Sequence, residues 1–173
     1  MKFQETSKNY SLNKSTYINL RWIAYLGQLT AILVVQLYFQ YKFDYFICIS
    51  IVFFSVLSNL FLKFKIKENQ LNNFVSTLYL GFDIMQLAIL LFFTGGVTNP
   101  FIILIIIPAV LSSQYLSALS SIILVALTSL ALILLLFYHF DLPLPDQLHF
   151  HVPSYYLYSI PISIFIGLVF LTY

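Results

Sequence analysis

The sequence has little charge. Eight lysines and arginines and six aspartates and glutamates make up 8% of its 173 residues, whereas hydrophobic residues reach 61% and the mean hydropathy is +0.93. Ordinary globular chains carry about 25% charged residues. So few charged side chains cannot cover a water-facing surface. The composition therefore excludes a cytosolic enzyme, a nucleic-acid binder and a secreted disulfide scaffold, and it indicates that most of the chain faces lipid.

Cysteine and enzyme motifs are also scarce. Cys48 is the one cysteine, which excludes an intrachain disulfide, and its apolar surroundings indicate a small buried hydrophobe. No HExxH motif, repeated acidic cluster or Gly-Ser nucleophile elbow is present, so we predict no catalytic site in these residues. The polar segment 1–18 lacks an apolar run before a cleavage site and does not resemble a signal peptide.

Long hydrophobic runs, in contrast, occur six times. A membrane-spanning helix needs roughly 20 apolar residues, and the short alternating segments of a membrane barrel are absent. We therefore predict an all-α integral membrane domain over 19–173, a bundle of six transmembrane helices. Pro108 and Pro161 are expected to kink the fourth and sixth helices. The expected spans are 20–39, 44–63, 73–93, 100–116, 118–140 and 154–173.

The basic residues predict the orientation, because loops rich in lysine and arginine stay in the cytoplasm. All the lysines and arginines except Lys42 lie on one side of the six spans, which is therefore expected to be the cytoplasmic side. We expect both termini in the cytoplasm and outer loops at 41–43, 94–99 and 141–153. The chain stops within or just after an apolar run, and we expect a cytoplasmic portion to follow. The basic residues on the expected cytoplasmic side are Lys2, Lys8, Lys14, Arg21, Lys63, Lys65 and Lys67.

Polar residues within the spans call for partners, because polar groups are costly in a bilayer. Asp83 lies deep in the third span and shares a helical face with Gln86. We expect Asp83 to be protonated or hydrogen-bonded, with Gln28 of the first span as its partner. Arg21 and Asn59 form a second expected pair nearer the cytoplasm. The alternative is that these groups only hold the helices together, at about 0.6 kcal/mol per hydrogen bond.

The outer turn TGGVTNPF at 94–101 has the chemistry of a helix–turn–helix junction. Gly95 and Gly96 suit left-handed backbone angles, Asn99 suits an N-cap, and Pro100 suits the first helical position. Glycine also lets a flat ligand approach the backbone, and Phe101 offers a ring for stacking. Unpaired amide groups at a helix start can donate hydrogen bonds. A quinone, which is apolar with a flat carbonyl-bearing head, fits these features.

Several stretches resemble the RegB/PrrB family of redox-responsive sensor histidine kinases. TGGVTNPF is similar to the family's GGxxNPF signature, and RWIAYLGQ at 21–28 is similar to its RWxAxxGQ pattern in the first span. These motifs occur in the family's order, and the resemblance covers nearly all of the chain from Arg21. Further matches are Asn59, Phe82, Asp83, Gln86, Leu87, Pro108 and the stretch DLPL at 141–144.

The resemblance implies a six-span sensor in the bacterial inner membrane, with both termini inside and a cytoplasmic kinase after the sixth span. It implies a homodimer that senses the ubiquinone or menaquinone pool, with oxidised quinone lowering kinase output, and that signals to a cytoplasmic response regulator. The implied quinone site comprises Gly95, Gly96, Thr98, Asn99, Pro100 and Phe101. Supporting or alternative lining residues are Trp22, Gln28, Asp83 and Gln86, with Arg21 and Asn59 as structural polar groups.

Two other interpretations stay open at this point. Substrate-binding subunits of vitamin transporters are six-span proteins of similar size, but the first span lacks their AxxxA face. The histidines and aspartates of the 139–151 region could hold zinc. Side chains in a wet interfacial loop explain them more simply, so we predict no metal site. The residues concerned are His139, Asp141, Asp146, His149 and His151.

Overall fold

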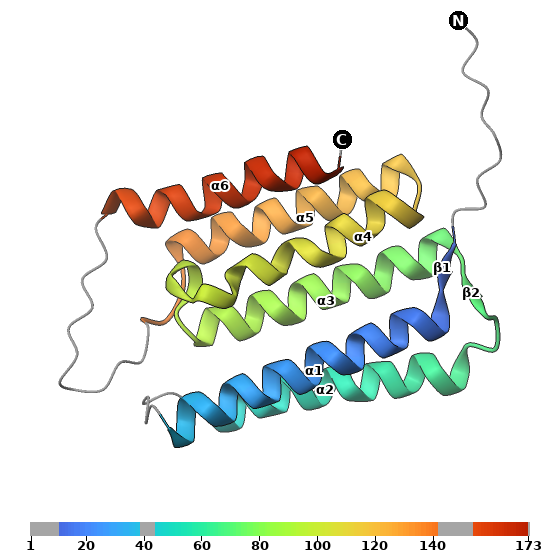
Figure 1. The fold of residues 1–173 in the computed structure, drawn as a ribbon, viewed down its shortest axis with the longest axis horizontal. Coiled ribbons are helices and arrows are strands. Elements are labelled where there is room, and N and C mark those ends of the chain that lie inside the picture. The colour runs from blue at the N-terminus through green and yellow to red at the C-terminus, as the bar shows by residue number, and fades with distance from the viewer. Residues whose placement is uncertain (1–10, 39–43, 142–153, 173) are drawn as a thin grey trace, which may run out of the picture.

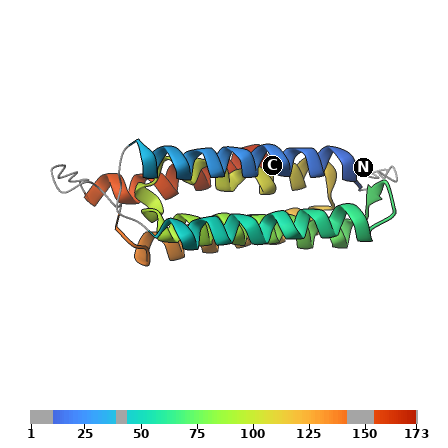
Figure 2. The same cartoon turned by 90° about the horizontal axis from the view of Figure 1, so that it is seen from below.

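The computed structural model of the protein describes residues 11–38, 44–141 and 154–172. The α-helices form two layers, with α1, α4 and α6 in one and α2, α3 and α5 in the other (Figure 1, Figure 2). The start of α1 and the end of α6 lie toward the same end of the bundle (Figure 1). The helices are α1 (Lys14–Leu37), α2 (Tyr45–Lys65), α3 (Asn73–Phe93), α4 (Ile107–Tyr115), α5 (Ala118–Phe137) and α6 (Ser154–Thr172).

The helix lengths and surfaces are those of a multi-pass membrane protein. In the described part of the chain, α1, α2, α3 and α5 are long and apolar enough to cross a bilayer. Pro100–Tyr115 and Leu157–Leu171 are shorter apolar helices. Large apolar side chains cover the outside of the bundle, while polar groups such as Ser55 and Thr128 are fully buried. This reversal of the soluble pattern confirms the predicted all-helical membrane domain.

Short polar side chains set where the helices begin. The side chain of Asn13 accepts a hydrogen bond from the Thr16 amide at 3.1 Å, so α1 begins at Lys14, well before the expected residue 20. Asp44 and Asn72 cap α2 and α3 in the same way. Each cap satisfies an amide that would otherwise lack a partner at the helix start.

A two-stranded ladder joins the segment before α1 to the α2–α3 connection, which the sequence did not predict. Strand β1 (Leu12–Asn13) pairs antiparallel with β2 (Gln70–Leu71), and the Lys14 amide donates to the Asn69 carbonyl at 3.0 Å. Two-residue strands are too short to show the alternation by which strands are recognised. This end of the bundle, which carries Lys14 and Lys63, is called the lysine end below.

The fourth span differs from the predicted single helix with a kink at Pro108. A 3-10 segment, η2 (Pro100–Ile106), precedes α4, and Pro108 lies in the first turn of α4. Proline fits there because its missing amide would lack a helical partner anyway. The helix therefore changes type next to Pro108 instead of kinking in its middle. In contrast, α6 continues through Pro161.

The α4–α5 connection is a tight turn with an uncharged sequence. Only Leu116 and Ser117 separate the two helices, and the Ser117 side chain caps α5 by accepting from the Ser120 amide. Asn73 of α3 braces the turn by accepting from the Ser117 amide at 2.9 Å and donating to the Ser120 hydroxyl at 2.7 Å. This turn also lies at the lysine end, opposite the 94–101 turn (Figure 1).

Candidate functional site

The 94–101 turn is a buried, left-handed junction between α3 and η2. Gly95 and Gly96 have φ angles of 109° and 53°, and both are buried. A short 3-10 segment, η1 (Gly96–Thr98), follows, and the Thr98 hydroxyl donates to the Gly95 carbonyl at 2.6 Å. The glycine pair is therefore required by the backbone angles, as predicted.

Asn99 holds the turn together with both ends of its side chain. Its Nδ2 donates to the carbonyl and hydroxyl oxygens of Thr94 at 2.9 and 2.8 Å, and its Oδ1 accepts from the Phe101 amide at 2.9 Å. The predicted N-cap role is confirmed. Because Nδ2 makes two hydrogen bonds within the turn, a ligand that accepts a hydrogen bond from Asn99 must replace one of them.

His139 and Phe140, just after α5, cover this turn. A Cβ atom added at Gly96 would lie only 2.8 Å from His139 Nδ1, so the imidazole rests directly on the glycine. The Phe140 amide donates to the Phe92 carbonyl at 2.9 Å, and the Phe140 ring stacks on Phe93 at 5.5 Å between centroids. His139 Nδ1 is buried without a hydrogen-bond partner among the described residues.

Part of the turn remains accessible. Pro100 is exposed, and the Phe101 side chain is 47% exposed on the surface of the bundle. Asn99 is only 9% exposed. The turn therefore presents a proline and an aromatic ring outward, while its polar side chain faces inward.

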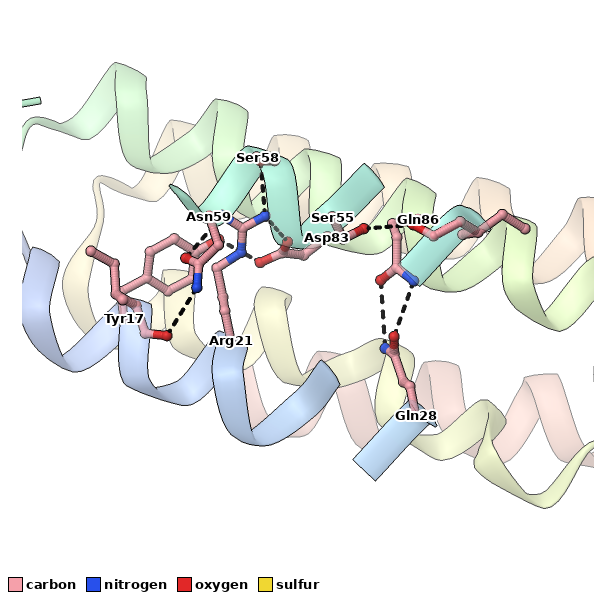
Figure 3. A network of polar contacts seen from close by, with 10 residues as sticks. Tyr17, Arg21, Gln28, Ser55, Ser58, Asn59, Asp83 and Gln86 are labelled. Atoms are coloured by element: carbon pink, nitrogen blue, oxygen red, sulfur yellow. Dashed lines mark hydrogen bonds and ion pairs between the residues drawn. The ribbon is translucent and has the colours of Figure 1, made fainter. Parts of the chain in front are cut away.

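A second polar site lies between α1, α2 and α3, toward the lysine end. Arg21 Nη2 lies 2.9 Å from Asp83 Oδ1, and the side chains are 3% and 17% exposed (Figure 3). The Tyr17 hydroxyl donates to Asp83 Oδ2 at 2.5 Å. The remaining contacts are Arg21 with Ser58 at 3.1 Å, Arg21 with Asn59 at 3.5 Å, and Asn59 with the Ile18 carbonyl at 3.3 Å.

Aromatic rings enclose the guanidinium of Arg21. Its Cζ lies 5.4 to 5.9 Å from four ring centroids, within the range of cation–π attraction. Such rings compensate part of the hydration that a buried cation loses. The four rings belong to Tyr17, Tyr25, Tyr79 and Phe82.

The expected partners of Asp83 and Gln28 were wrong, and the expected pair of Arg21 with Asn59 is present. Gln28 pairs with Gln86 instead, through reciprocal amide bonds of 3.1 and 3.5 Å (Figure 3). Asp83 pairs with Arg21, because a hydrogen bond between a carboxylate and a cation is stronger than one between a carboxylate and a neutral amide. The Arg21–Asp83 pair and the Gln28–Gln86 pair together connect α1 to α3.

The polar site and the 94–101 turn are separate places. Gln86 lies eight residues before Thr94 on α3, which is about 12 Å along the axis, and Asp83 is farther still. Trp22 lies in the half of α1 that is nearer the lysine end. The structure therefore does not bring Trp22 or Asp83 to the turn.

Sequence reasoning missed Tyr17 and His139. Tyr17 is four residues before Arg21, so helical spacing places the two on one face, and a phenol beside a buried ion pair was a usable signal. His139 was assigned to a wet loop, and nothing local in the sequence places it on Gly96.

Metal ligands do not cluster in the described ranges, where no group of three histidines, cysteines or acidic residues could hold an ion. Asp146, His149 and His151 lie outside those ranges. The same holds for Lys42 and the 41–43 loop.

Comparison with known proteins agrees with this architecture. The sensor histidine kinase RegB of Cereibacter sphaeroides is 36% identical over 157 residues, which cover 90% of this chain and 34% of RegB. The chain thus spans about a third of the length of that relative, and the resemblance noted in the sequence is confirmed. No solved structure matches. The model of the PilS-like transmembrane domain matches residues 16–172, and the chain therefore belongs to this family.

Proposed function

We propose that this domain is the quinone-responsive membrane sensor of a histidine kinase, with the quinone head group bound at the 94–101 turn. The quinone is ubiquinone or menaquinone, and the signal passes to a cytoplasmic kinase and then to a response regulator. The full protein acts as a homodimer in the bacterial inner membrane, with both chain termini of this domain in the cytoplasm.

One observation carries the proposal. In a chain 36% identical to a sensor histidine kinase, the turn combines two left-handed buried glycines with an exposed aromatic ring. Phe101 is 47% exposed beside these glycines, so its ring is accessible to a ligand that approaches from the lipid. A flat head group can stack on that ring, and such stacking is worth about 0.5–1.5 kcal/mol beyond the buried area.

Hydrogen-bond roles provide the redox discrimination. A quinone carbonyl only accepts, whereas a quinol hydroxyl also donates. His139 Nδ1 accepts or donates according to its tautomer, and it is the buried polar atom at this turn that lacks a partner among the described residues. Asn99 shapes the site by bracing Thr94 and Phe101. The distinction between quinone and quinol therefore depends on His139 and on backbone groups of the turn.

Helix α3 supports a route for the signal. Its C-terminal end, Phe93, adjoins the turn, and its middle carries Asp83 and Gln86, which contact Arg21 and Gln28 of α1. A small shift of α3 therefore changes contacts with α1, the helix whose start lies at the lysine end. A ligand drives such a shift only if it binds the shifted and the unshifted position of α3 with different affinities.

Replacing Phe101 by leucine tests the position of the site. Binding of a short-chain ubiquinone to the protein in nanodiscs is expected to weaken about threefold to tenfold, because the stacking partner is lost while an apolar surface remains. Equilibrium dialysis with radiolabelled quinone measures this without depending on Trp22.

Phe46→Leu is the matched control, since Phe46 is an exposed phenylalanine, 68% exposed, in the first turn of α2. Its binding should equal that of the unchanged protein. Equal weakening in both variants would indicate partitioning into the lipid instead of a site, and unchanged binding in Phe101→Leu would place the quinone away from the turn.

A further inference from the structure

A groove lies at the lysine end, between the start of α1 and the end of α2, away from the 94–101 turn. Its volume is about 380 Å³, the space of roughly a dozen water molecules. It is lined by Lys14, Ser15, Ile18, Asn19, Trp22 and Lys63.

Two lysines, and no acidic residue, are among the residues that line the groove. Lys14 Nζ donates to the Ile66 carbonyl at 2.6 Å, and Lys63 is exposed. Within the described ranges neither lysine forms an ion pair, and the ion pair found there joins Arg21 to Asp83. The first turn of α1 adds the partial positive charge of a helix N-terminus. An anion is the ligand that these groups favour.

The remaining walls suit a lipid. Trp22 is half-buried and Ile18 is buried, so the groove lining includes an indole ring and an aliphatic side chain. Tryptophan is enriched at the boundary between head groups and acyl chains. Farther along α1, apolar side chains lie on the outer surface of the bundle, among them Ile23 at 67% and Leu26 at 62% exposure. A ligand with an anionic head and an acyl tail matches both surfaces at once.

We infer that this groove binds the phosphodiester head group of an anionic phospholipid. Lys14 and Lys63 contact the phosphate, Ser15 and Asn19 contact the polar head, and the acyl chains follow Trp22 down α1. The lipid bridges α1 and α2 at the end where β1 and β2 join the N-terminal segment to the α2–α3 connection.

Native mass spectrometry of the protein titrated with phosphatidylglycerol tests this site. Lys63→Gln is expected to weaken the first binding event about fivefold, the effect of one lysine near an anionic lipid surface. Lys63→Arg keeps the charge and should bind as the unchanged protein does. Lys65→Gln removes an equal charge from an exposed residue of the same helix end that does not line the groove, and should also bind normally.

Three results would overturn the inference. Equal weakening in Lys65→Gln would mean diffuse attraction to the basic end. Equal affinity for phosphatidylcholine would show that the net charge of the lipid is not recognised. Displacement of phosphatidylglycerol by millimolar inorganic phosphate would assign the groove to a soluble anion instead of a lipid. Thermal unfolding in lipid-free detergent checks that each variant is folded.

Discussion

Replacing Asp83 by leucine is expected to destabilise the protein by about 3–5 kcal/mol, because Arg21 is left buried without its counter-charge. Arg21 is 3% exposed, so water offsets little of the lost counter-charge. The same change removes the acceptor for the Tyr17 hydroxyl. Reversible unfolding in mixed micelles measures the loss.

The double variant Arg21→Met, Asp83→Leu should lose less than the sum of the two single variants, since it leaves no unpaired charge. Glu68→Leu is the control, because Glu68 is an exposed acid and exposed substitutions usually stay within about 0.5 kcal/mol. Additive losses in the double variant would show that Arg21 and Asp83 do not depend on one another.

Replacing Gly96 by alanine is expected to have the second large effect. A positive φ of 53° costs a residue with a Cβ about 1–2 kcal/mol. The added methyl group would also overlap the His139 ring, and overpacking of this kind costs about 1–3 kcal/mol. Unfolding in mixed micelles should therefore show a loss of about 2–5 kcal/mol.

His139→Ala in the Gly96→Ala background separates the two costs, because it removes the overlap and leaves the backbone strain. Gly27→Ala is the matched control: Gly27 lies within α1, and a Cβ there meets nothing within 4 Å. That change should be neutral or slightly stabilising, because alanine is the better helix former. A Gly96→Ala protein as stable as the Gly27→Ala protein would contradict the geometry of the turn.

The helices and the turn were predictable because their signals are local. Six apolar runs gave the helices, and Gly95, Gly96, Asn99 and Pro100 each performed the backbone role that its chemistry suggests. Two short features were not predicted. The 3-10 geometry of η2 and the two-residue strands have no periodic pattern long enough to recognise.

Partners across the bundle were not predictable to the same degree. The sequence indicates the depth and face of Gln28 and Asp83, but the choice between Gln86 and Asp83 depends on the rotation and spacing of α1 and α3. Likewise, His139 reaches Gly96 only because α5 ends beside the turn. Such contacts depend on how whole helices pack, not on the residues next to them in the sequence.

The central claim is that this domain distinguishes oxidised from reduced quinone. The most direct test is the affinity of the unchanged protein in nanodiscs for a short-chain ubiquinone and for its quinol, measured under argon by equilibrium dialysis. We expect saturable binding of both, with dissociation constants that differ about fivefold or more, the lower limit of a useful coupling free energy. Equal dissociation constants, or uptake that never saturates, would contradict the account.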